Sequence, residues 1–422
     1  MISQTLNDTK VYPLSGNDSL LIRAGRVFDG KKISKNLDVL LAGGRIARVG
    51  APGSFDAADA EILDAREKFL MPGLIESHVH LSGMQTSDPY KRYFEPETTR
   101  LVRGLRHAEE LLSRGFTTVK DMGGKGKGVE LNDIRRKGLF VGPHILSAHE
   151  AITPTFGHFD WPVLPFEFVR DTRLRGTIAD GPEACRQAVR LMFREGADFI
   201  KICTSATPVQ FSDVDEKIKP CYSVEEIRAL CDEAHAHGKL VCSHAVDHIG
   251  ICNAIAGGVD IVEHCFHDSE RHPEILELLL ENDVAIIPTV SLLKWKSEMQ
   301  EKKGDIDGAR DFANLFERHK RFVKKAHEGG LRMATGTDEN GLYGIGRNCE
   351  ELIYLRDAGI DAVDVLRCAT SQAAQISGID GLTGSVWPSY RADLLLLARD
   401  PSADLGVLKD KKNIEAVFLG TE

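Results

Sequence analysis

The feature that most constrains the fold is an alternation of short apolar runs with amphipathic stretches through the middle of the chain. Eight runs have the length and composition of strands. They are 74–81, 117–122, 144–149, 198–205, 240–245, 261–265, 285–290 and 333–338. Helical patterns fill the gaps, most clearly in PEACRQAVRLMFREGA and SVEEIRALCDEAHAHG. Such alternation is typical of parallel sheets, and eight strand–helix units predict an α/β fold of the (β/α)₈ TIM-like barrel type over residues 70–384.

An open, doubly wound sheet is the structural alternative. It would require a glycine-rich phosphate loop directly after the first strand. The segment DMGGKGKG, residues 121–128, contains glycines, but it follows the second run and lacks the GxGxxG spacing. The sequence therefore favours the barrel over a nucleotide-binding sheet.

The two ends of the chain have a different texture. The segments SLLIRAGRVFDG, LDVLLAGGRIARVG and AEILDAREKFLMPG are short apolar runs separated by Gly and Asp turn signals. ADLLLLARDP and NIEAVFLGTE repeat this pattern near the C-terminus. We expect residues 1–69 and 385–422 to form one small β-sandwich domain.

Charge and cysteine content exclude several functional classes. The formal net charge is −10, and the Lys and Arg residues are scattered, which argues against a nucleic-acid or membrane partner. The nine cysteines are odd in number and form no CxxC pair, so a disulfide framework is not expected. Residues 1–15 lack the pattern of a secretory signal, and no apolar run is long enough to span a bilayer. These features predict a cytoplasmic protein.

Polar residues stand at or near the C-terminal ends of five of the eight runs. They are His78, His80, Lys201, His244, His264 and Asp338. In a barrel, the C-terminal ends of the strands meet at one mouth, where active sites form. Two histidines two residues apart on a strand point to the same face. Several imidazoles together with a carboxylate indicate a metal site rather than an acid–base pair.

These segments resemble the amidohydrolase superfamily. MPGLIESHVHL is similar to its PG–hydrophobic–hydrophobic–DxHxH signature, with Glu76 in place of the usual Asp. KICTSA, VCSHAVD, IVEHC and TGTDEN resemble its lysine, two histidine and aspartate stations, in the expected order. TTVKDMGG and GSVWPSYRADLLLLARDP resemble its second strand and its return to the small β domain.

The resemblance implies a centre of two divalent metal ions, for which we expect Zn²⁺. His78 and His80 would bind the more buried ion, and His244 and His264 the second. Lys201 would be carboxylated by CO₂ and bridge the two ions as a carbamate. Asp338 would bind the first ion and act as general base toward a metal-bridging hydroxide.

Within the superfamily, the chain is most similar to the branch of prolidase-like dipeptidases that includes hydrolases of ochratoxin-type amides and phenylureas. AITPTFGHFD resembles that branch's TPTGGHG loop, and CYSVEEIRAL its YSxEEL segment. This implies that His158 hydrogen-bonds the substrate carbonyl and that Tyr222 holds its carboxylate. For Tyr222, an aromatic side chain that covers the barrel rim is the alternative. Phe156 and Phe159 replace glycines, which predicts a narrower pocket for aromatic or apolar groups. Arg347 is a further candidate for binding a carboxylate, with a solvent-facing position at a helix start as the alternative.

The predicted function is hydrolysis of the amide bond of a dipeptide or N-acyl amino acid, including ochratoxin-like amides. Hydrolysis of ureas, carbamates or cyclic amides on the same centre is the enzymatic alternative. A metal-free structural relative is the non-enzymatic one, and the presence of all six stations argues against it. The partners expected are a small-molecule amide and further copies of the chain in a homo-oligomer.

Overall fold

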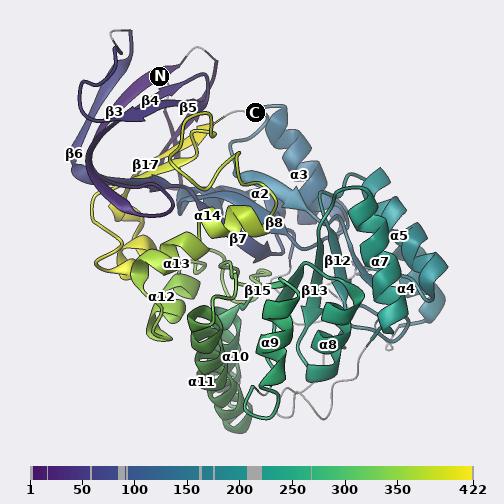
Figure 1. Ribbon diagram of the computed structural model, residues 1–422. Coiled ribbons are helices and arrows are strands. Elements are labelled where there is room, and N and C mark those ends of the chain that lie inside the picture. The colour runs from purple at the N-terminus through teal and green to yellow at the C-terminus, as the bar shows by residue number, and fades with distance from the viewer. Residues whose placement is uncertain are drawn as a thin grey trace.

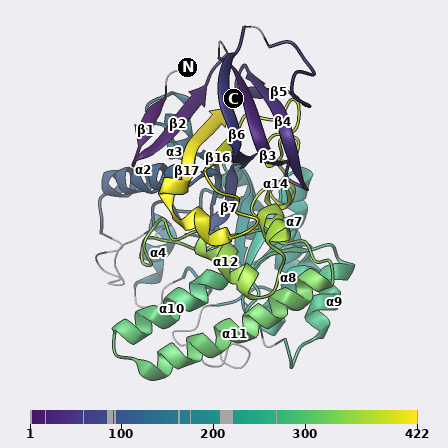
Figure 2. The same cartoon turned by 90° about the vertical axis from the view of Figure 1, so that its left-hand side faces the viewer.

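The computed structural model describes residues 3–16, 18–57, 59–83, 91, 94–160, 164–173, 176–206, 221–267 and 269–420. Figure 1 shows a β-sheet region, which contains both chain ends, above a larger region in which helices surround strands. The same two regions are separate in the rotated view of Figure 2. Within the described parts of the chain, no helix has the length and apolar character needed to cross a membrane.

The β region is a single sheet of eight strands from both chain ends. Its order is β1-β2-β17-β16-β6-β3-β4-β5. The strands are β1 (Gln4–Leu6), β2 (Thr9–Leu14), β3 (Ser19–Phe28), β4 (Ile33–Ala42), β5 (Arg45–Gly50), β6 (Glu61–Pro72), β16 (Leu394–Leu397) and β17 (Ile414–Gly420). Strands from both chain ends thus lie in one continuous sheet, where the sequence predicted a sandwich of two sheets. The bounds of the small β domain stay a prediction. Ile22 of β3, Val39 of β4 and Phe418 of β17 are buried together in a hydrophobic core of this sheet.

The strands of the second region are all parallel. One sheet has the order β7-β8-β9, and the other β11-β10-β12-β13-β14-β15. Their bounds are β7 (Leu74–Val79), β8 (Phe116–Asp121), β9 (His144–Ser147), β10 (Ala151–Thr153), β11 (Gly176–Ile178), β12 (Ile200–Cys203), β13 (Val241–Ala245), β14 (Ile261–His264) and β15 (Ala285–Ile287). Seven of the eight predicted runs are therefore strands. The short strands β10 and β11 were not predicted, because three residues carry no readable periodicity.

The eighth predicted run, residues 333–338, forms isolated bridges instead of a regular strand. Ile286 pairs with Met333, and Val79 pairs with Glu339, so the segment lies between β15 and β7. Gly336 permits this close approach, since an added Cβ would lie 2.9 Å from the His78 nitrogen. The amide of Asp338 donates to the His78 carbonyl over 2.8 Å. Asp338 has a φ of 56°, so the chain turns there and leaves the ladder.

Helices alternate with these strands. They are α2 (Glu97–Ser113), α3 (Lys127–Arg136), α4 (Phe166–Thr172), α5 (Pro182–Arg194), α7 (Val224–Ala236), α8 (His248–Gly257), α9 (Glu274–Glu281), α10 (Val290–Lys302), α11 (Ile306–Glu328), α12 (Glu350–Asp357), α13 (Ala362–Cys368) and α14 (Ser371–Ile376). Both helical stretches that the sequence predicted most clearly, α5 and α7, are confirmed. A capping box of Ser223 and Glu226 starts α7. The helices bury their apolar faces against the strands in one large core.

Candidate metal centre

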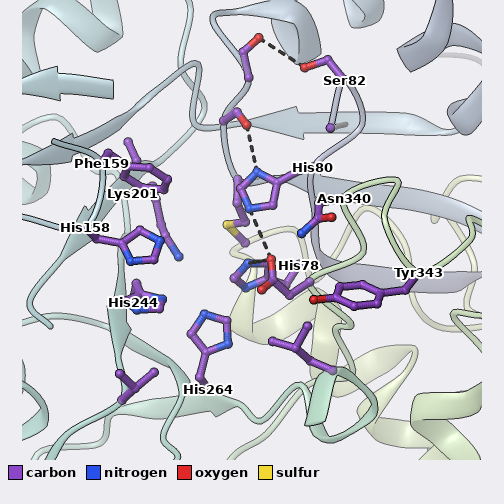
Figure 3. Close-up of a pocket in the computed structure, with 18 of the residues that line it drawn as sticks. His78, His80, Ser82, His158, Phe159, Lys201, His244, His264, Asn340 and Tyr343 are labelled. Atoms are coloured by element: carbon purple, nitrogen blue, oxygen red, sulfur yellow. Dashed lines mark hydrogen bonds and ion pairs between the residues drawn. The ribbon is translucent and has the colours of Figure 1, made fainter. Parts of the chain in front are cut away.

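His78, His80 and Asp338 converge where β7 meets the segment 333–339. His78 lies in β7 and His80 directly follows it, so their rings share a face of the strand. The Asp338 Oδ1 atom lies 3.3 Å from His78 Nε2 and 3.4 Å from His80 Nε2. The carbonyl oxygen of Gly123 lies 2.9 Å from Nδ1 of His80 and so fixes the orientation of the His80 ring. Figure 3 shows the rings of His78 and His80 in this group.

His244 and His264 face this group from two neighbouring strands. His244 lies in β13 and His264 ends β14. Their ring centroids are 4.7 Å apart, and the His264 ring is 5.0 Å from that of His78. The Nδ1 atom of His264 hydrogen-bonds the Thr289 hydroxyl over 2.8 Å, which leaves its Nε2 atom for another partner. His264 has a φ of 70°, a conformation that is uncommon for a non-glycine residue and concentrates at functional sites.

Lys201 lies in β12, where its side chain is buried beside that of Glu263. The Lys201 Nζ atom contacts Glu263 Oε2, and Glu263 Oε1 lies 3.4 Å from His78 Nδ1. Glu263 thus joins the lysine and one histidine of the group. Sequence reasoning missed Glu263, although a charged residue inside the apolar run before His264 was a readable signal.

The charge states of the group suit metal binding. Burial lowers the pKa of His78 to about 3, and burial also holds the pKa values of His244 and His264 well below their usual range. Neutral imidazoles offer a free nitrogen lone pair. Burial would raise the pKa of Asp338, but the imidazoles of His78 and His80 hold it well below its usual value. Burial lowers the pKa of Lys201 to about 8, which favours the free amine that reaction with CO₂ requires.

The donor set fits divalent metal ions. Two groups, His78–His80–Asp338 and His78–Glu263–His264, each place one ligand atom per residue within 4.8 Å of the others. His78 Nδ1 and Glu263 Oε1 are buried, lie 3.4 Å apart and form no hydrogen bond in the described structure, whereas Glu263 Oε2 pairs with Lys201. Buried polar atoms of this kind call for a further polar or ionic partner. Imidazole nitrogens and carboxylate oxygens are ligands that Zn²⁺ prefers.

Glu76 hydrogen-bonds the backbone and side chains that support His78 and Asp338. Its Oε1 accepts from the amides of His78 and Thr337, both over 3.0 Å. Its Oε2 accepts from the Thr337 hydroxyl over 2.9 Å and from Asn348 Nδ2 over 2.7 Å. Burial raises the pKa of Glu76 to about 8, yet all four partners are donors, which is the arrangement of an ionised carboxylate. Glu76 thereby fixes β7 relative to the segment that carries Asp338.

The converging residues line a cavity of about 240 Å³. Its lining includes His78, His80, His158, Lys201, His244, His264 and Asp338, and also Arg100, Lys125 and Lys296. The His158 ring lies 4.2 Å from that of His244 and 4.5 Å from that of Phe159, as Figure 3 shows. Phe159 contributes to the cavity wall, as expected. Phe156 does not, because its side chain points to solvent and is 76% exposed.

Two predicted substrate-binding residues lie outside this lining. The Tyr222 hydroxyl is buried and donates to the Ala179 carbonyl over 3.0 Å. Arg347 pairs with Glu298 over 3.0 Å and with Glu350 over 2.8 Å. Their polar atoms are thus committed to the protein, and the geometry lends no support to a direct role in substrate binding for either residue.

A second group of potential ligands lies on the surface. His248, His272 and Glu274 place ligand atoms within 4.8 Å of one another. The two imidazoles stack face to face, with centroids 3.8 Å apart and planes inclined by 8°. Parallel rings hold their in-plane lone pairs in separate planes, so they do not converge on one ion. This arrangement is unlike that of the buried group.

Comparison with known proteins agrees with this geometry. Residues 69–421 match the model of the Amidohydrolase family. Ochratoxinase from Aspergillus niger is 28% identical over 375 residues, covering 84% of this chain and 75% of that protein. A solved Xaa-Pro dipeptidase with bound methionine in its active site is 26% identical, with a TM-score of 0.84 over 96% of this chain and 99% of that chain. The crystal structure of A. niger ochratoxinase is 25% identical, with a TM-score of 0.84 over 96% and 95% of the two chains. The chain therefore belongs to the amidohydrolase family of hydrolases.

Proposed function

We propose that the chain hydrolyses the amide bond of N-acyl amino acids or dipeptides with an apolar or aromatic residue. The observation that carries the proposal is the convergence of four imidazoles, Lys201 and Asp338 on one cavity, with His158 beside them. Two similar proteins support the substrate class. One is an ochratoxinase, and the other is a Xaa-Pro dipeptidase that holds methionine in its active site. The apolar lining residues Phe159, Phe266 and Leu292 suit a hydrophobic side chain.

We infer that the cavity holds two divalent metal ions, with Zn²⁺ the expected metal. His78, His80 and Asp338 would hold one ion, and His244 and His264 the other. A carboxylated Lys201 would be shared between them. When bound, the ions would lower the pKa of a water molecule and polarise the substrate carbonyl.

The residues of the chain supply the proton transfers. Asp338 takes one proton from the attacking water as its oxygen bonds to the carbonyl carbon, and it passes that proton to the amide nitrogen as the C–N bond breaks. The products are a carboxylate and a free amine. His158 donates a hydrogen bond to the carbonyl oxygen as negative charge develops there. Glu263 and Glu76 act as positioning residues for Lys201 and His78.

We also infer that the parallel strands close into a (β/α)₈ barrel around this centre. Two junctions support closure. The bridges of Met333 and Glu339 connect β15 to β7. The Asp198 amide donates to the Ser147 carbonyl over 2.8 Å, which joins β9 to the segment that leads into β12.

A substrate screen of the metal-loaded protein tests the proposed function. N-acyl amino acids, dipeptides, ureas and lactams are incubated with the wild type and with Asp338→Asn, and the release of free amine is measured. We expect turnover of N-acyl amino acids or dipeptides by the wild type only. Turnover confined to ureas or lactams would assign a different substrate class, and no turnover of any compound would refute the proposal.

A further inference from the structure

Apart from the candidate metal ligands, the described charged residues that line the cavity are all basic. Its basic lining residues are Arg100, Lys125, Lys201 and Lys296, whereas Asp338 is the sole acid among the described lining residues. Lys201 and Asp338 already belong to the candidate metal centre. The remaining three cations make the cavity complementary to an anionic group on the ligand.

Each of these three cations lies near acidic groups of the protein. Arg100 has Glu95 at 3.9 Å, measured from Nε to Oε2. Lys125 lies in the field of Glu97 and Glu150. Burial lowers the pKa of Lys296 to about 8, and Asp338 is the charge that opposes this shift. Lys296 lines the cavity within electrostatic range of Asp338 and His244, so an anionic ligand in the cavity would stabilise its charged form.

The helix that carries Lys296 is held firmly. Trp295 Nε1 donates to Glu350 Oε2 over 2.8 Å. At the start of α10, the amides of Val290 and Ser291 donate to the buried Glu351 carboxylate over 2.9 and 2.7 Å. Figures 1 and 2 both show α10 packed along α11. Such support reduces the entropy lost when a ligand is bound.

The position of Lys296 relative to the apolar wall is also suitable. Leu292 lies one helical turn before Lys296, and both side chains line the cavity. Phe266 lines the same cavity, with its ring 5.4 Å from that of His264. An apolar amino acid bound against Leu292 and Phe266 therefore has a cation within reach of its carboxylate. The Lys296 Nζ atom rests 5.6 Å from the Phe312 ring centroid, a contact that a carboxylate would replace with a stronger one.

We propose that Lys296 binds the carboxylate of the amino-acid part of the substrate and so selects acids over neutral amides. This inference rests on the proposed function and assigns the charge selectivity of that site. Because the carboxylate contact is the same before and during reaction, its loss acts on KM more than on kcat.

The test compares Lys296→Met with Lys294→Met in the metal-loaded protein. Lys294 lies on the same helix with a side chain 42% exposed and 3.9 Å from Glu298, so its substitution is the matched control. The substrates are N-acetyl-L-phenylalanine and N-acetyl-2-phenylethylamine, which differ only in the carboxylate. We expect Lys296→Met to raise KM for the acid on the order of 10- to 100-fold and to leave the neutral amide unchanged. Lys294→Met should match the wild type, and Lys296→Arg should retain most of the preference for the acid.

Calorimetric binding of 3-phenylpropanoate separates this inference from the proposed function. Weaker binding to Lys296→Met than to both the wild type and Lys294→Met supports the role of Lys296, even if no amide is cleaved. Equal binding to all three proteins, no binding to the wild type, or an unchanged preference for the acid in Lys296→Met would overturn it.

Discussion

The ammonium group of Lys201 contacts the carboxylate of Glu263, and both side chains are fully buried. A buried cation needs a compensating anion. Glu263 provides it from β14, which is separated from the Lys201 strand by β13, and it also lies 3.4 Å from His78. Carboxylation of Lys201 would remove its positive charge but keep one N–H group. Glu263 could still accept a hydrogen bond from that group. The pair therefore explains how the chain holds the lysine in place before and after metal binding.

Glu263→Gln should weaken metal binding about 10- to 100-fold, because residues that orient metal ligands contribute on that scale. Gln keeps the shape of Glu but has only one acceptor oxygen. Metal affinity is measured by competition with a chelator. Glu274→Gln is the control, because Glu274 is a surface residue 48% exposed. Unchanged affinity in Glu263→Gln would mean that Glu263 serves only the fold.

Lys201→Ala should lose activity and most of the second metal ion, since the carboxylated Lys201 would supply an anionic ligand to that ion. Metal content and turnover are measured together. Added short-chain carboxylic acids should restore part of the rate, because they can take the place of a carbamate. A variant with full activity and full metal content would remove Lys201 from the centre.

Asp338→Asn should lower kcat by about 10²- to 10⁴-fold, the usual contribution of a general base. Asn retains the size of Asp and an oxygen ligand, but it does not accept the proton. The measurements are kcat, KM and metal content on the substrate that the screen identifies. If kcat stays within a few-fold of wild type with metal bound, another group is the base, and His158 is the next candidate.

The stability of the fold should fall with acid partly through His319, which is not one of the candidate metal ligands. His319 is buried on α11 with Nε2 2.9 Å from the Pro288 carbonyl, and burial lowers its pKa to about 3. The unfolded chain, with an ordinary pKa near 6.5, binds the proton first. Below about pH 6.5 the free energy of unfolding therefore falls by up to about 1.4 kcal/mol per pH unit, until the pH reaches the pKa of His319 in the folded protein.

His319→Gln keeps a side-chain donor for Pro288 but does not titrate. Urea unfolding of the metal-free wild type and variant between pH 7 and 4 provides the comparison. We expect the free energy of unfolding to decline less steeply with acid in the variant. Parallel curves would show that His319 is not a source of acid sensitivity.

Most of the residues that converge in the structure were predicted from the sequence, because polar residues at the C-terminal ends of parallel strands can be recognised after apolar runs. His78, His80, His244 and His264 end strands whose apolar runs are readable, and a parallel sheet brings such ends together. Lys201 was found in the same way. The family match then supplied roles that spacing alone leaves open.

Residues that depend on long-range packing were harder to predict. Glu263 lies inside an apolar run, and its partner Lys201 is 62 positions earlier in the sequence, so no local pattern links them. Tyr222 was placed at the substrate by resemblance, but its hydroxyl is held by Ala179. Lys296 lies on a helix after the seventh strand, where polar residues normally face solvent. Assembly into a homo-oligomer stays a prediction.

Metal content measured against activity tests the central claim most directly. Protein purified without chelators and supplied with bicarbonate and Zn²⁺ is analysed by elemental analysis, and portions stripped by chelator are titrated back with metal. The account predicts about two ions per chain, with hydrolysis lost on stripping and regained as both ions are restored. Full amide hydrolysis by protein with essentially no bound metal would contradict it.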